Sequence, residues 1–229
     1  MLWYVELDLI LSATQKSRVR FTHGDTSWDW PLGNSAQRRA TWVEVVARLS
    51  EHDADYRTSW LQDAKAELGV ADVVERYVSD PALRTRFALM GKRELRELAE
   101  AGMAVGAHTV SHPLLSKQSA TAAEYEMRES QQILAEALGE RVWSLAYPFG
   151  YAGSATTREF DIAKRVGYEC AFLNFGGPVR PKSTLFSLPR VHVTAEMRAS
   201  ELEAHVSGFH WKLHRYLHPA SWKLGFANP

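Results

Sequence analysis

Two histidines, His108 and His112, have the residue type and the spacing that can hold a metal ion. Neutral imidazole is a common zinc ligand, and two rings four residues apart can reach one ion when the chain between them is helical or tightly turned. Pro113 disfavours helical backbone at the residue before it, so we expect a loop or a single turn here. The pair is also consistent with one helix-capping histidine and one buried histidine whose hydrogen bonds are satisfied.

Three further candidates stand at the ends of predicted strands. Tyr147 precedes Pro148 at the end of one strand, and Arg190 and His192 stand in another. Because side chains two apart in a strand point to one face, we expect Arg190 and His192 to face the same cleft as His108. Arg190 could pair with a carboxylate at the site or make a structural ion pair. His192 is a candidate general acid.

These residues need elements to position them, and the second part of the chain alternates strands with helices. Such alternation indicates parallel β/α units, in which chemistry sits on the loops after the carboxyl ends of the strands. Serine or threonine followed three residues later by glutamate indicates three helix starts, at Thr121, Thr156 and Ser200. We expect helices at 92–101, 121–138, 156–167 and 200–217, and strands at 103–107, 143–147, 169–173 and 188–193.

The first part of the chain, up to about residue 90, shows no such alternation. Two short strand-like runs, 18–21 and 27–32, flank a turn-rich centre and predict a hairpin. Apolar residues at helical spacing predict helices at 37–49 and 55–68, followed by shorter helices within 71–88. We therefore expect a mostly helical insertion or subdomain.

Composition restricts the function classes. The 229 residues, 45% of them hydrophobic, suffice for one sizeable core, and 27 basic residues balance 27 acidic ones. This balance gives no sign of a nucleic-acid partner. Cys170 is the only cysteine, which excludes a disulfide framework and suggests a buried structural thiol. The acidic start and the lack of an apolar run of ~20 residues predict a cytoplasmic protein with no integral membrane segment.

Three segments, taken in order, resemble a known family. Gly-Ala-His-Thr-Val-Ser-His-Pro at 106–113 is similar to the His-[Ser/Thr]-x-x-His-Pro motif of the polysaccharide deacetylases, the NodB-homology or carbohydrate esterase family 4 group. Leu-Ala-Tyr-Pro-Phe-Gly at 145–150 resembles that family's later Tyr-Pro loop, and Leu-Pro-Arg-Val-His-Val at 188–193 resembles its Pro-Arg strand. The resemblance covers roughly residues 90–210.

The resemblance implies an α/β fold: a distorted, incomplete (β/α) barrel with a mostly helical N-terminal insertion. It implies hydrolysis of N-acetyl groups on amino sugars of a polysaccharide or its precursor, with a divalent metal, typically zinc, held by one aspartate and two histidines. His108 and His112 match the two histidines, and the backbone N–H of Tyr147 matches the donor to the tetrahedral oxyanion. We expect 1–90 to be the insertion, 91–217 the catalytic portion and 218–229 a C-terminal tail.

The sequence departs from the family at one motif. Thr-Phe-Asp-Asp-Gly, which supplies the family's catalytic base and aspartate ligand, does not occur. We expect Met1 to lie inside the family's domain and the strand that bears the two aspartates to be absent from this chain. Asp25 and Asp29 are the alternative candidates to replace the missing ligand. Two alternatives stay open: a catalytically impaired carbohydrate- or partner-binding relative, and a different metal hydrolase that shares only the histidine spacing.

Overall fold

The computed structural model describes residues 1–217, so the tail expected at 218–229 lies outside the described residues. The chain divides into two compact units, Met1–Glu94 and Leu95–Pro229. The boundary falls within helix α6 (Lys92–Glu100). No helix in residues 1–217 is long and apolar enough to cross a bilayer.

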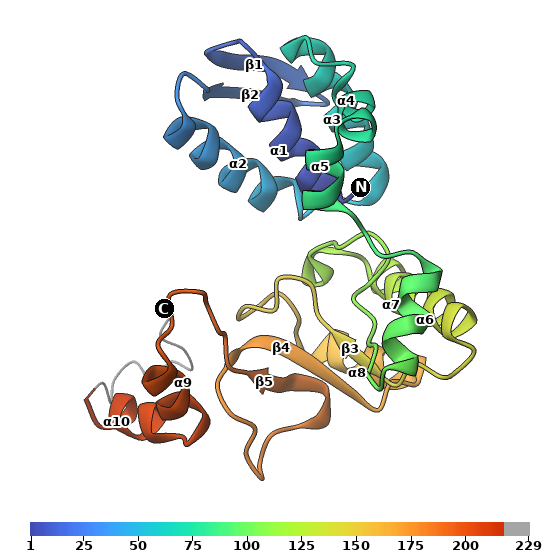
Figure 1. Cartoon of the computed structure of the whole chain (residues 1–229), viewed down its shortest axis with the longest axis vertical. Coiled ribbons are helices and arrows are strands. Elements are labelled where there is room, and N and C mark those ends of the chain that lie inside the picture. Colours follow the sequence, from blue (N-terminus) through green and yellow to red (C-terminus); the bar gives the residue numbers. More distant parts are fainter. Residues whose placement is uncertain (218–229) are drawn as a thin grey trace. The chain divides into compact units, whose positions relative to one another are not determined.

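The first unit is a β-hairpin with helices (Figure 1). The two strands pair antiparallel from Arg18 with Pro31 to His23 with Thr26, and Gly24 takes a left-handed φ of 57° in the turn. The predicted hairpin is confirmed, with each strand reaching further into the turn than expected. The elements are α1 (Trp3–Ala13), β1 (Arg18–His23), β2 (Thr26–Pro31), α2 (Ser35–Leu49), α3 (Ala54–Leu68), α4 (Val73–Ser79) and α5 (Pro81–Phe87).

Aromatic side chains from the hairpin and α3 form the centre of this unit's core. Trp28 and Trp60 are each 2% exposed, with ring centroids 5.2 Å apart in an edge-on arrangement. Phe21 packs on Trp60 at the same centroid distance. Leu7 and Ile10 of α1 are fully buried in the same cluster. Helix α1 was not expected from the sequence, and its buried apolar face contributes to this core.

The second unit contains a small parallel sheet with helices (Figure 1). Its strands lie in the order β3-β4-β5, with Ser144 opposite Cys170 and Phe172 opposite Leu188. The expected α/β class is confirmed, whereas the incomplete barrel stays a prediction. The elements after α6 are η1 (Leu115–Lys117), α7 (Ala120–Leu138), β3 (Ser144–Ala146), α8 (Thr157–Val166), β4 (Cys170–Gly176), η2 (Leu185–Ser187), β5 (Leu188–Arg190), α9 (Ala199–Val206) and α10 (Phe209–Leu217).

The strand predicted at 103–107 is wrong. Only Ala107 pairs, in an isolated parallel bridge with Leu145. Its N–H donates to the Ser144 carbonyl at 2.9 Å, and its carbonyl accepts from the Ala146 N–H at 2.8 Å. Met103 is 58% exposed, and the run reaches the core only at Ala107, which is 1% exposed.

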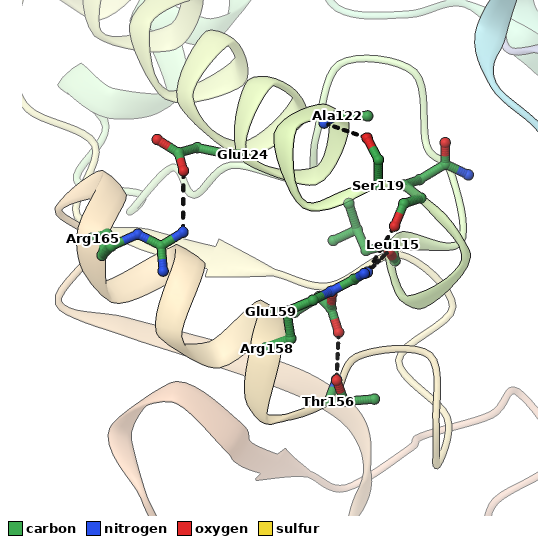
Figure 2. Close-up of polar contacts among 9 residues, drawn as sticks. Leu115, Ser119, Ala122, Glu124, Thr156, Arg158, Glu159 and Arg165 are labelled. Atoms are coloured by element: carbon green, nitrogen blue, oxygen red, sulfur yellow. Dashed lines mark hydrogen bonds and ion pairs between the residues drawn. The ribbon is translucent and has the colours of Figure 1, made fainter.

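Of the three predicted capping boxes, one is confirmed. Thr156 and Glu159 exchange hydrogen bonds at the start of α8. Helix α7 is capped instead by Ser119, whose side chain accepts from the Ala122 N–H at 3.1 Å (Figure 2). Helix α9 begins after Arg198 and has no side-chain cap. The single helix expected at 200–217 is interrupted between α9 and α10, where Gly208 takes a φ of 76°.

A buried carboxylate links the start of α8 to the segment before α7 (Figure 2). Glu159 has no exposed surface and accepts from the backbone and hydroxyl of Thr156, both at 2.8 Å. It also accepts from Arg158, whose guanidinium donates to the carbonyls of Leu115 and Gln118. The arginine therefore neutralises the buried charge and connects two segments far apart in the sequence.

Candidate metal site

His108 follows directly on the bridge at Ala107 and has a fixed tautomer. Its Nδ1 lies 2.7 Å from the carbonyl oxygen of Ala146, which can only accept a hydrogen bond. Nδ1 therefore carries the proton, and Nε2 keeps the lone pair that a metal requires. Loss of water around the ring lowers the pKa of His108, with a smaller contribution from the positive charge of Arg190, while the bond to Ala146 opposes the shift.

His112 lies beside His108 at the end of the same loop. The two ring centroids are 4.9 Å apart and the rings are nearly perpendicular, at 75°. The Phe149 ring also packs edge-on against the His112 ring, at 4.9 Å between centroids. The His112 N–H donates to Thr109 Oγ1 at 3.2 Å. The backbone between the histidines is not helical, so the loop expected from Pro113 is confirmed.

Sequence reasoning missed the residue that holds this loop. Glu126 on α7 accepts hydrogen bonds from the N–H groups of Val110 and Ser111, at 2.8 and 2.9 Å, and from the Ser111 hydroxyl. Its side chain falls on the buried face of α7 that also carries Ala123 and Met127. A carboxylate on an otherwise apolar helix face was the signal in the sequence that could have identified it.

A cleft of about 310 Å³ opens next to His108. Arg190 lies in its wall, and its Nε donates to the Leu173 carbonyl at 2.7 Å. His192 is exposed, two residues beyond the end of β5, and is not in the cleft wall as far as the described residues define it. The wall is formed by His108, Ala146, Tyr147, Phe149, Asn174 and Arg190.

The expected role of Tyr147 needs correction. Its backbone N–H donates to the Phe172 carbonyl at 3.0 Å, inside the sheet, so it is not directed at the cleft. Its hydroxyl donates to the Phe186 carbonyl, also at 3.0 Å, and the side chain is 1% exposed. Burial is the main reason why the pKa of the phenol is raised. In this arrangement Tyr147 supports the cleft wall, and the oxyanion contact has no support from the geometry.

The two aspartates considered as replacement ligands lie in the first unit. Asp29 on β2 accepts from Arg18 and Arg20, and the bond with Arg18 is the main reason why its pKa is lowered to about 2. Asp25 lies in the hairpin turn. Among the side chains that the structure describes, no three from histidine, cysteine, aspartate or glutamate are grouped so that they could hold a metal ion.

Comparison with known proteins identifies the family. A sequence profile described as polysaccharide deacetylase matches residues 35–171, more than half of the chain. The chain therefore belongs to the polysaccharide deacetylase family, as its three motifs indicated.

Individual relatives are distant. YxkH of Bacillus subtilis (strain 168), which carries the name of a polysaccharide deacetylase, is 22% identical over 115 residues, or 50% of this chain and 40% of YxkH. The Streptococcus pyogenes deacetylase PplD in complex with acetate is 23% identical with a TM-score of 0.49, over 60% of this chain and 64% of that one. BC0361, a polysaccharide deacetylase from Bacillus cereus, is 22% identical with a TM-score of 0.44, over 51% of this chain and 36% of that one. This chain spans less than two thirds of each relative.

Proposed function

We propose that this chain carries the metal site and the substrate cleft of a metal-dependent hydrolase that removes N-acetyl groups from amino sugars of a polysaccharide or its precursor. His108 and His112 provide two imidazole ligands for a divalent ion, with zinc as the proposed metal. The observation that carries the proposal is the bond from His108 Nδ1 to the Ala146 carbonyl, which leaves Nε2 as the ligand atom next to the ring of His112. The donor set fits zinc, because imidazole nitrogen is among its usual ligands.

Besides the histidine pair, three residues of the cleft wall and His192, which lies outside the wall, have roles in this proposal. A divalent ion at the histidine pair supplies Lewis-acid chemistry to an amide carbonyl. Phe149 gives an apolar surface for the substrate, and the amide group of Asn174 can hydrogen-bond to its polar groups. Arg190 is proposed to orient a carboxylate at the site. His192 remains the proposed acid that protonates the leaving amine.

The catalytic base is the open part of this mechanism. A carboxylate that takes a proton from water typically contributes ~10²–10⁴-fold to the rate. The sequence has no Thr-Phe-Asp-Asp-Gly motif to provide it. We therefore expect the 229-residue chain to release acetate from acetylated amino-sugar oligomers at or near the background rate. Strong zinc-dependent release would show that a carboxylate inside the chain acts as base, and Asp25 would be the first to replace.

Zinc titration by calorimetry tests the ligand assignment. The parent chain should bind zinc weakly, because two imidazoles leave the coordination sphere open, and the double variant His108→Ala/His112→Ala should lose this binding. His52→Ala is the matched control, because His52 is an exposed histidine that stacks on Tyr56 in the first unit. Equal zinc affinity in the parent and the double variant would refute the assignment.

A second candidate function is carbohydrate binding without hydrolysis. Tyr151, which is 49% exposed, packs edge-on against Phe149 at 6.3 Å between centroids. Exposed aromatic faces beside a polar cleft can bind sugar rings whether or not a metal is present. Carbohydrate binding would be favoured over hydrolysis if the double histidine variant still bound acetylated amino-sugar oligomers and the parent chain released no acetate.

A further inference from the structure

The loop between the two histidines is fastened to a helix by a single buried carboxylate. Glu126 is 9% exposed, and it accepts from the backbone of Val110 and of Ser111 and from the Ser111 hydroxyl. These residues are 15 and 16 positions away in the sequence. Hydrogen bonds to an ionised carboxylate are stronger than bonds between neutral groups, so this is a firm attachment.

The loop needs such an attachment because its backbone is strained. Thr109 has a φ of 67° and His112 a φ of 55°, both in the left-handed region that non-glycine residues rarely adopt. Thr109 is β-branched, which makes its conformation less favourable still. A strained loop persists only where its surroundings hold it. Glu126 bonds to the two residues that lie between the strained positions.

The attachment lies in the stretch of chain between the two imidazoles. Val110 and Ser111 lie within the segment whose ends are His108 and His112. The His108 ring is fixed separately by its bond to the Ala146 carbonyl. The bonds from Val110 and Ser111 to Glu126 therefore act mainly on the position of His112 relative to His108. Metal ligands must be held within about 0.5 Å of the required geometry, so a loop free to relax would separate them.

We propose that Glu126 is a positioning residue for the imidazole pair. This role rests on the proposed metal site. The carboxylate touches neither substrate nor metal; it acts through Val110 and Ser111 and keeps the loop in the conformation that brings the two rings together. Its replacement should weaken zinc binding much more than a comparable replacement elsewhere on α7.

The test compares Glu126→Ala with Glu124→Ala. The first substitution removes the acceptor of all three hydrogen bonds and leaves the N–H groups of Val110 and Ser111 without a carboxylate partner, so the loop should detach. Glu124 lies on the same helix and pairs at the surface with Arg128 and with Arg165, and Figure 2 shows the pair with Arg165. Zinc affinity should fall about 10- to 100-fold in Glu126→Ala and change by less than about twofold in Glu124→Ala. Thermal unfolding of both variants separates this effect from a general loss of stability.

A second readout does not depend on zinc. Amide hydrogen exchange at Val110 and Ser111 should accelerate about tenfold or more in Glu126→Ala, and not in Glu124→Ala. If the parent binds no zinc, the metal site is refuted, and unchanged exchange at these two amides would then refute the positioning role by itself. If Glu126→Ala does not fold, Ser111→Ala replaces it as the test. Ser111→Ala removes one of the three bonds and should give a smaller change in the same direction. Parent-like exchange and zinc affinity in a folded variant would overturn the proposal.

Discussion

The two units are stabilised in different ways. In Met1–Glu94, large apolar side chains such as Trp28 and Trp60 fill the core. In the second unit many core positions are alanines, and two carboxylates, Glu126 and Glu159, are buried with their hydrogen bonds satisfied. The first unit also buries a charged side chain, Arg57, whose guanidinium lies over the Trp3 ring. Packing of large side chains therefore dominates the first unit, whereas hydrogen bonds to buried carboxylates hold a loop and a helix cap in the second.

Backbone strain follows the same division. Within the described residues, the non-glycine residues with positive φ are Thr109, His112 and Phe149. All three belong to the second unit and border the candidate metal site. Strained backbone is retained where the surrounding structure holds it, and it gathers at functional sites. Substitutions should thus change stability in the first unit and both stability and site geometry in the second.

The largest effect is expected in the first unit's core. Trp60→Ala should lower the free energy of unfolding by about 3–5 kcal/mol, because it leaves a cavity between Phe21 and Trp28. Trp60→Phe is the matched control and should cost much less, because the indole N–H has no hydrogen-bond acceptor among the described residues. Urea unfolding measures both. A cost below about 1 kcal/mol for Trp60→Ala would contradict a core dominated by packing.

In the second unit, Glu159→Ala should cost about 2–3 kcal/mol of stability, because it removes the helix cap at Thr156 and leaves Arg158 without its buried partner. Asp161→Ala, an exposed acid on the same helix, should change stability by less than about 0.5 kcal/mol. If thermal and urea unfolding gave the two variants equal stability, buried hydrogen bonds would not be what fastens this unit.

Gly150→Ala tests the wall of the cleft. Gly150 has a φ of 65°, and an added Cβ would lie 2.5 Å from the backbone nitrogen of Asn174. The left-handed conformation alone should cost about 1–2 kcal/mol, and the clash should displace the loop. Gly153→Ala is the control, because Gly153 has a φ of 89° but no atom within 4 Å of the added Cβ. Zinc affinity should fall only in Gly150→Ala, and parallel behaviour of the two variants would contradict this.

The smallest expected effect is a gain of stability. Asparagine tolerates a left-handed backbone better than threonine, so Thr109→Asn should stabilise the chain by about 0.5–1 kcal/mol. Its side-chain oxygen can still accept from the His112 N–H. A loss of stability in urea unfolding would show that the loop around Thr109 is not strained in the way that its backbone angle indicates.

Helices with local signals could be predicted from the sequence, and those without them could not. Helix α8 has its capping box and Gly167 as its stop, and both lie where the pattern put them. Helix α1 was missed because apolar residues occupy most of Trp3–Ala13 and show no clear helical period. The strand at 103–107 failed because an apolar run predicts a strand only if a neighbouring strand pairs with it.

The candidate site, like the fold, has features that local sequence patterns predict and features that they do not. The spacing of His108 and His112, with Pro113 after them, predicted a non-helical loop after a sheet position. The contact with Glu126 could not be predicted, because it joins residues 15 positions apart through a hydrogen bond that no local pattern encodes. The hydrogen bond from the Tyr147 N–H to the Phe172 carbonyl could not be predicted either, because it depends on which strand pairs with β3.

Zinc K-edge X-ray absorption of the chain with one equivalent of zinc tests the ligand assignment most directly. We expect two imidazole nitrogens at about 2.0–2.1 Å, with the remaining coordination positions filled by oxygen. The imidazole signal should disappear in the His108→Ala/His112→Ala variant and persist in His52→Ala. A sulfur neighbour at about 2.3 Å, which would implicate Cys170, or an imidazole signal that survives in the double variant, would contradict the assignment.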